Sequence, residues 1–234
     1  MARQARTIVP GVAHHVTQRG NRREAIFLQP GDEAVYLDLM STQLRRRDVA
    51  CWAYCLMPNH VHLILTPEDG TGLALAVGEA HRRYTAFIGA RGGWTGHLFQ
   101  GRFGSVAMDE DHLMAAFRYV ALNPVKAGLV ARAADWPWSS AAAHIVGRST
   151  PHVSVEPALA RIDNFAAHVA GEADDQARWA EVLKAELIGR PVGAKAWIDK
   201  LEARFGRPMS PQRRGPKPRQ PRDAETGSGE LLGN

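Results

Sequence analysis

Two hydrophobic periods alternate along the first half of the chain, and each period predicts one type of element. Segments 12–18, 49–57 and 60–66 have the character of strands, and a tight turn at Pro58-Asn59 joins the last two into a hairpin. Between and after them, apolar residues recur every three or four positions, which predicts amphipathic helices. The first helix is expected over 32–47, and the second carries its apolar stripe on Leu73, Val77, Ala80, Tyr84, Phe87 and Ile88.

A further strand within 99–108 and a third helix that opens at Asp109 complete this pattern. The predicted order is β-α-β-β-α-β with a helix after it, which is the arrangement of the ferredoxin-like fold. We therefore predict an α+β protein with a split β-α-β antiparallel sheet and helices on one face. The other face of such a sheet is free, and a free face can carry a site.

The second half of the chain has a different pattern, and we divide the sequence into three parts. The first domain spans 1–147, and a stretch rich in Ser, Thr, Pro and Gly marks its end. A small helical region follows at 148–209, with Trp179 and Leu201 among its helically spaced apolar residues. The tail at 210–234 is basic and rich in proline. We expect it to be disordered, either as a solvated tail or as an arm that binds phosphates.

Composition and charge narrow the class of partner. Lys and Arg outnumber Asp and Glu by 29 to 24, and the net charge of +5 favours a polyanion such as nucleic acid. No run of 18 apolar residues occurs, and the first residues lack the apolar core of a signal peptide. We therefore expect a cytoplasmic protein with no membrane partner.

The two cysteines, Cys51 and Cys55, fall in one predicted strand and are expected on the same face. Four residues of strand span about 13 Å, which is beyond the reach of a disulfide. We interpret both as buried thiols in a reducing compartment. A zinc site built from them with His60 and His62 is an alternative, although four-residue spacing along a strand suits it poorly.

His60 and His62 flank Val61 at the start of the returning strand. Residues two apart in a strand share a face, with Cα atoms about 6.5–7 Å apart, so both imidazoles can reach one metal ion. Val61, Leu63 and Leu65 point the other way, into a core. The alternative interpretation is that the histidines are only the polar end of a strand.

The third helix carries a second group of candidates. Its apolar stripe is formed by Leu113, Phe117 and Val120. Tyr119 and Asn123 are i and i+4, so they share a face nearly opposite that stripe, and His112 falls there as well. Asn123 precedes Pro124, which places it in the last turn of the helix. Tyr119 by itself is also compatible with an exposed aromatic residue, whereas Tyr84 lies on a core stripe.

Four motifs in this order resemble those of a known family. They are Arg19-Gly-Asn21, Met57-Pro-Asn-His-Val-His62, Phe99-Gln-Gly-Arg-Phe103 and Arg118-Tyr-Val-Ala-Leu-Asn-Pro-Val-Lys-Ala-Gly128. With Trp136-Pro-Trp-Ser-Ser140 at its end, the likeness covers about residues 7–145. The chain resembles the single-tyrosine HUH transposases of the insertion-sequence type, in particular the REP-associated tyrosine transposases.

This resemblance implies a site. In that family two histidines hold a divalent metal, usually magnesium or manganese, and a tyrosine attacks a phosphate of single-stranded DNA. A polar residue four positions after the tyrosine completes the metal site. The matching positions are His60, His62, Tyr119 and Asn123. Basic and polar residues of the motif turns are candidates for DNA contact, namely Arg19, Asn21, Arg22, Arg23 and Arg102.

Two positions depart from the family pattern. His112 stands where an aromatic residue is expected at the helix start, and Gly104 stands where relatives often carry a basic residue. Neither change removes a nucleophile or a metal ligand.

The resulting hypothesis is a metal-dependent endonuclease and strand transferase. It would act on single-stranded or hairpin, REP-like DNA through a 5′-phosphotyrosine intermediate in DNA transposition. Two alternatives stay open, a non-catalytic nucleic-acid-binding module on the same fold and an HUH nickase of the replication or relaxase type. The resemblance also implies a bacterial protein, a monomer or homodimer, that associates with the nucleoid when bound to DNA. Whether Tyr119 serves the histidines of its own chain or of a partner stays open.

Overall fold

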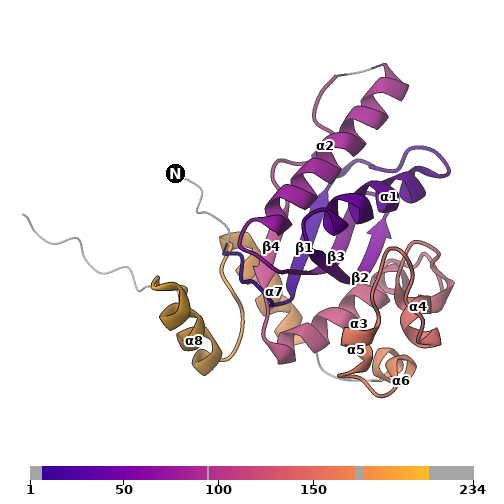
Figure 1. The fold of residues 1–234 in the computed structure, drawn as a ribbon. Helices are drawn as coiled ribbons and strands as arrows, with labels where there is room; N and C mark the ends of the chain where they lie inside the picture. Colours follow the sequence, from indigo (N-terminus) through magenta and orange to yellow (C-terminus); the bar gives the residue numbers. More distant parts are fainter. Residues whose placement is uncertain (1–6, 94, 172–175, 211–234) are drawn as a thin grey trace, which may run out of the picture.

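A four-stranded antiparallel sheet in the order β2-β3-β1-β4 forms the centre of the computed structural model, which describes residues 7–93, 95–171 and 176–210 (Figure 1). Strands β1 and β3 lie in the middle, and β2 and β4 lie at the edges, as the ferredoxin-like arrangement requires. The predicted α+β class with a split antiparallel sheet is therefore confirmed. The strands are β1 (His14–Arg19), β2 (Val49–Met57), β3 (His60–Pro67) and β4 (Gly104–Ala107).

One face of the sheet is covered by α1 (Asp32–Arg45) and α2 (Gly72–Gly92), which lie across it together (Figure 1). Their apolar stripes and the Val61 side of β3 form one core. Tyr84 is fully buried in this core, and its hydroxyl donates to the backbone oxygen of Ile26 at 2.8 Å. The prediction that Tyr84 is a core residue is therefore confirmed.

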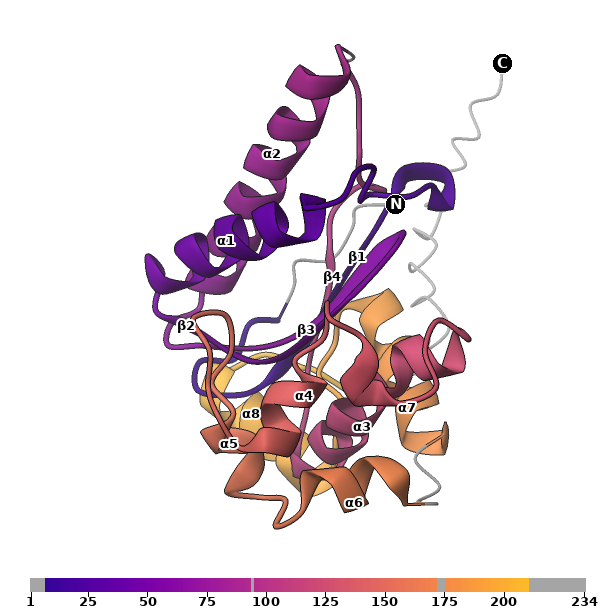
Figure 2. The same ribbon diagram turned by 90° about the vertical axis from the view of Figure 1, so that its right-hand side faces the viewer.

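The opposite face, which the sequence predicts to be free, is covered by α3 (Glu110–Lys126) and by α7 (Gln176–Ile188). Figure 2 shows the sheet between this layer and the layer of α1 and α2. The physical reason is that Cys55, Met57 and Ile64 make this face apolar as well, and α3 and α7 bury it in a second core. The C-terminal region thus reaches the face on which the candidate site lies.

Strand β2 contains a bulge between Cys51 and Ala53, where its register against β3 shifts. The extra residue reverses the face onto which the later side chains point. Cys51 packs against the core of α1 and α2, whereas Cys55 is buried in the core beneath α3. The prediction that the two thiols share a face is therefore wrong. Burial raises the pKa of each thiol to about 12.

Helix α3 begins after the N-cap Asp109 and continues through Pro124. The sequence predicts the last turn at Asn123 and a separate short turn after it, so the helix is longer than expected. Proline removes one hydrogen bond from a helix, but only the end of the last turn follows it here. Gly128, with φ 70°, then allows the chain to turn away. Asn123 keeps its place one turn beyond Tyr119.

The open edge of β2 is paired by the segment 136–140. The backbone N of Leu56 donates to the backbone O of Trp138 at 2.8 Å, and the backbone N of Ser140 donates to the backbone O of Tyr54 at 3.0 Å. Unpaired edge groups invite pairing with other chains, so this segment protects the strand.

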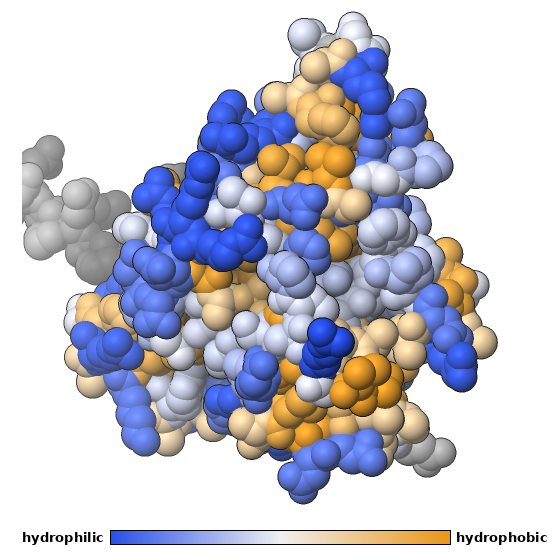
Figure 3. Space-filling view, turned by 45° about the vertical axis from the view of Figure 1, so that its right-hand side comes forward, coloured by the Kyte–Doolittle hydropathy of each residue, from blue (hydrophilic) through white to orange (hydrophobic). Residues whose placement is uncertain are grey.

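The remaining elements are short, and several share the second core. Helices α5, α6 and α7 contribute to the core beneath α3, while α8 packs near Val9 and Ala107. Hydrophilic residues dominate the side of the molecule shown in Figure 3, with apolar side chains in separate patches. The remaining helices are η1 (Asn21–Arg23), η2 (Ala133–Asp135), α4 (Ala141–Val146), α5 (Glu156–Leu159), α6 (Phe165–Ala170) and α8 (Lys195–Phe205).

The predicted tail at 210–234 lies outside the described residues except for Ser210. The division at 147 and 148 stays a prediction. Within the described part of the chain, no helix has the length and apolar character needed to cross a membrane.

Candidate active site

His60 and His62 lie at the start of β3 and point to the same face, towards α3 and α7. Their ring centroids are 4.9 Å apart, and the rings are nearly perpendicular. Val61, between them, points into the core of α1 and α2 on the other side of the sheet. The strand period therefore predicted the relative placement of the two imidazoles correctly.

Each imidazole has its Nδ1 atom beside a neighbouring side chain. His60 Nδ1 lies 2.6 Å from Oδ1 of Asn59, an acceptor, so His60 carries its proton on Nδ1. His62 Nδ1 lies 3.0 Å from Nε2 of His15. His62 Nε2 is buried and has no hydrogen-bond partner among the described residues. This atom is therefore available to a ligand.

Both imidazoles are neutral at pH 7. Burial lowers the pKa of His60 to about 4, and the charge of Arg19 acts in the same direction. Burial also lowers the pKa of His62 well below its usual value, with smaller effects from His15, His60 and Arg19. A neutral imidazole has the lone pair that a metal ligand needs.

Tyr119 and Asn123 approach this pair from α3 of the same chain. The ring centroids of Tyr119 and His62 are 5.5 Å apart, in an edge-to-face arrangement. Asn123 is buried one turn further along, and its Nδ2 has no hydrogen-bond partner in the described structure. Burial raises the pKa of the Tyr119 hydroxyl, an effect that the Trp179 and Asn123 side chains only partly offset. The predicted nucleophile thus lies beside a histidine of its own chain.

Three further residues at this site were not predicted from the sequence. Trp179 of α7, expected only as part of an apolar stripe, stacks on the Tyr119 ring with centroids 3.6 Å apart. Trp179 also meets His15 of β1 edge-on, at 4.8 Å between centroids. No local pattern marks either residue, because these contacts depend on how α7 docks against the sheet. The Nζ atom of Lys126 lies over the Tyr119 ring, 5.1 Å from its centroid.

The candidate residues for DNA contact gather at the end of β1. Gly20 forms a bridge with Phe99, and the backbone N of Gln100 donates to the backbone O of Arg19 at 2.8 Å. The loop that contains Arg102 therefore lies beside the turn that follows β1. All five candidates are exposed, namely Arg19, Asn21, Arg22, Arg23 and Arg102.

His112, which the sequence places on the same helix face, does not join the site. Its Nδ1 lies 2.6 Å from Oδ1 of Asp109, and its Nε2 lies 3.0 Å from Oε2 of Glu181 on α7. Among the described residues, no group of three or more His, Cys, Asp and Glu side chains is arranged to hold a metal. The alternative zinc site with the two cysteines thus has no support, and a metal at the histidine pair would need an amide ligand.

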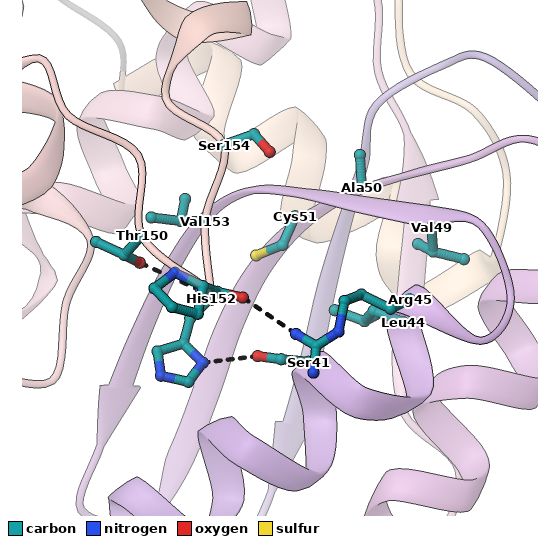
Figure 4. A pocket seen from close by; sticks show the side chains of 11 residues that line it. Ser41, Leu44, Arg45, Val49, Ala50, Cys51, Thr150, His152, Val153 and Ser154 are labelled. Atoms are coloured by element: carbon teal, nitrogen blue, oxygen red, sulfur yellow. Dashed lines mark hydrogen bonds between the residues drawn. The ribbon is translucent and has the colours of Figure 1, made fainter.

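A separate pocket lies between α1 and the segment 150–154 (Figure 4). Ser41 Oγ is 2.8 Å from Nδ1 of His152, and Arg45 donates to the backbone O of Pro151 at 3.3 Å. These bonds hold the segment against α1. His60, His62, Tyr119 and Asn123 do not line this pocket, and we assign no chemistry to it.

Residues 9–123 match the sequence model of a family described as Transposase IS200 like. The chain is similar to the structure of a REP-associated tyrosine transposase bound to a REP hairpin, with 22% identity and a TM-score of 0.53 over 66% of this chain and 92% of that chain. It is also similar to a putative transposase from Deinococcus radiodurans R1, with 18% identity and a TM-score of 0.36 over 51% of this chain and 95% of that chain. No curated protein matches the sequence.

Proposed function

We propose that the chain, whose residues 9–123 match the IS200-like transposase family, is a metal-dependent endonuclease and strand transferase that acts on single-stranded DNA. The observation that carries this proposal is the meeting of Tyr119 and His62 within one chain, with ring centroids 5.5 Å apart. A positioned nucleophile beside neutral imidazoles suits phosphoryl transfer to an amino-acid side chain. A non-catalytic binding module has no need of this arrangement.

Tyr119 is the proposed nucleophile. Its oxygen forms a bond to the phosphorus of a DNA phosphodiester, and the bond from phosphorus to the 3′ oxygen breaks. The phenol loses its proton and the 3′ oxygen gains one, which leaves a 5′-phosphotyrosine and a free 3′-OH. The raised pKa of Tyr119 keeps it protonated at neutral pH, so its attack must be coupled to proton loss. Attack by a 3′-OH on the phosphotyrosine reseals a strand without a nucleotide cofactor.

The histidine pair fits a divalent metal, magnesium or manganese. The buried Nε2 of His62 has no partner in the described structure, and contacts at Nδ1 orient both rings. His60, His62 and the amide oxygen of Asn123 would hold the ion, and these neutral ligands leave its charge for the anionic phosphate. When bound, the ion neutralises the phosphate and stabilises the departing oxygen. Nitrogen ligands suit manganese at least as well as magnesium, which prefers oxygen.

Hairpin DNA of the REP type is the proposed substrate. The similar solved structure is bound to a REP hairpin, and this chain carries an exposed basic surface at the end of β1. Phosphate contacts from such a surface supply salt-dependent affinity and position the strand. Because a single chain contains both Tyr119 and the histidine pair, a monomer suffices for cleavage. The residues of this surface are Arg19, Asn21, Arg22, Arg23 and Arg102.

The test is an adduct assay with Tyr119→Phe. Phenylalanine keeps the stacking on Trp179 but has no nucleophilic oxygen. The variant should bind labelled hairpin DNA with the wild-type Kd and form no covalent protein–DNA product on a denaturing gel. Tyr84→Phe, a matched change in the other core, should still form the adduct. An adduct with Tyr119→Phe would show that the nucleophile is another residue.

A second assay separates a transposase from an HUH nickase of the replication or relaxase type. A transposase should join the cleaved strand to a second, labelled single strand with a free 3′-OH. If the protein cleaves and only reseals the original strand, the nickase alternative is favoured.

A further inference from the structure

His15 lies between His62 and a carboxylate from the C-terminal region. It is fully buried on β1, and its Nε2 is 3.0 Å from Nδ1 of His62. On its other side, His15 Nδ1 is 3.5 Å from Oε2 of Glu186 on α7. This second contact is long, and Nδ1 makes no hydrogen bond within the described structure. A line of three side chains thus leads from α7 to the candidate site.

When each ring carries one proton, the hydrogen bond between the imidazoles of His15 and His62 has two possible directions. In the first, Nδ1–H of His62 donates to His15, so His62 Nε2 has a lone pair and His15 carries its proton on Nδ1. In the second, Nε2–H of His15 donates to His62, so His62 carries its proton on Nε2. Only the first direction lets His62 bind a metal through Nε2.

Glu186 distinguishes the two directions by electrostatics. In the first direction, His15 presents an N–H to the carboxylate, and in the second it presents a lone pair, which the negative charge repels. Burial raises the pKa of Glu186, but His15, Thr17 and Arg19 outweigh that effect and leave it below the usual value. Glu186 is therefore ionised at neutral pH. The Thr17 hydroxyl donates to its Oε1, which leaves Oε2 for His15.

We propose that Glu186 and His15 are positioning residues that hold the proton of His62 on Nδ1, so that Nε2 of His62 keeps a lone pair for a ligand. The consequence for metal binding rests on the proposed function, whereas the proton position does not. Contacts of this kind between a ligand histidine and its neighbours fix the ring tautomer and orientation. His60 has the equivalent arrangement with Asn59 at 2.6 Å.

Gly104 supports a defined position for the carboxylate. A Cβ atom at this position of β4 would collide with Oε1 of Glu186, so the carboxylate occupies space that only glycine leaves open. Glu186 also lies outside the segment 9–123 that matches the family. The C-terminal region of this chain therefore contributes to the site through a residue that the matched segment does not contain.

The experiment reads the tautomers directly in metal-free protein. Long-range ¹H–¹⁵N correlation spectra of histidine-labelled protein distinguish protonated from unprotonated ring nitrogens, and a His62→Gln spectrum assigns the His62 signals. In the wild type, His62 should be protonated on Nδ1 and His15 also on Nδ1. A wild-type His62 protonated on Nε2 would overturn the proposal without any variant.

Glu186→Gln makes the test sharper because glutamine has the same shape but can donate through its amide. The amide should donate to His15 and reverse the hydrogen bond between His15 and His62. The His62 proton should then move to Nε2. Manganese affinity, measured from the free-ion EPR signal, should then fall about 10–100-fold. The matched control is Glu181→Gln on the same helix, because Glu181 contacts His112 at 3.0 Å instead of His15. This variant should change neither the His62 tautomer nor the manganese affinity.

The outcomes separate this proposal from the proposed function. If Glu186→Gln folds, as judged by circular dichroism, and leaves the His62 tautomer unchanged, the positioning role is wrong. If the tautomer reverses but wild-type protein forms no adduct with DNA, the positioning role stands and the proposed function fails. If the tautomer reverses and manganese affinity does not change, His62 Nε2 is not a metal ligand.

Discussion

The indole of Trp179 lies face to face on the phenol of Tyr119, with ring centroids 3.6 Å apart and 16° between the ring planes. One of these rings belongs to α3 within the family segment, and the other to α7 beyond it. Packed aromatic pairs contribute about 0.5–1.5 kcal/mol beyond their buried area. The C-terminal region therefore helps to hold the proposed nucleophile in place.

Removal of this indole should destabilise the protein. Trp179 is 7% exposed, and deleting a core tryptophan costs about 3–5 kcal/mol of unfolding free energy. We expect Trp179→Ala to lose about that amount in urea unfolding and Trp179→Phe to lose clearly less, because it keeps an aromatic ring. Trp197→Ala, at a half-buried position on α8, is the matched control and should have a smaller effect. Equal losses at 179 and 197 would contradict the packing described.

Removal of either histidine should abolish cleavage but not binding. We expect His60→Ala and His62→Ala to form no covalent adduct while retaining a Kd for hairpin DNA close to that of the wild type, because the basic surface is unchanged. EDTA should have the same effect on the wild type. His152→Ala, in the pocket beside α1, is the control and should cleave normally. Adduct formation that persists in EDTA would remove the metal from the mechanism.

The basic surface at the end of β1 should determine the salt dependence of DNA binding. Neutralising one side chain that binds a phosphate lowers the slope of log K against log salt by about 0.7–0.9. We expect Arg22→Gln with Arg23→Gln to reduce the slope by up to about twice that amount, measured by fluorescence anisotropy. Arg46→Gln with Arg47→Gln removes the same charge from exposed positions after α1. An equal effect from this second pair would show that net charge, and not this surface, controls binding.

Buried histidines should make the fold sensitive to acid. Burial lowers the pKa of His14 to about 4 and that of His81 to about 3, whereas an unfolded histidine titrates near 6.5. Below 6.5 the unfolded state binds more protons, so stability is fully present above that pH and falls as the pH drops towards 4. The expected slope is about 1.4 kcal/mol per pH unit for each group.

His81→Gln tests that slope. His81 Nε2 lies 2.9 Å from the hydroxyl of Tyr36, and glutamine can still bond to that hydroxyl. The variant should therefore fold at pH 7. Between pH 6.5 and 4.5 its free energy of unfolding should fall less steeply than that of the wild type, by about 1.4 kcal/mol per pH unit. An unchanged slope in urea titrations would show that His81 does not carry this effect.

The local patterns predicted the parts of the site that lie within single elements. The strand period placed His60 and His62 on one face, and the helix period placed Tyr119 and Asn123 together, away from the core stripe. Both predictions succeed because backbone geometry alone relates residues two apart in a strand or four apart in a helix. One prediction failed because an extra residue changed that geometry: the bulge in β2 separated Cys51 from Cys55. Another failed because Pro124 did not end α3, which continued past Asn123.

By itself, the sequence determined that His60 and His62 share a face, that Tyr119 and Asn123 share another, and which fold class could bring these faces together. Only the tertiary structure decided that the second face of the sheet is covered, and that His15, Trp179 and Glu186 meet there with Tyr119 and His62. The physical reason is that contacts between distant segments depend on how apolar surface from the whole chain is buried. A periodicity within one element carries no information about which other element will cover it.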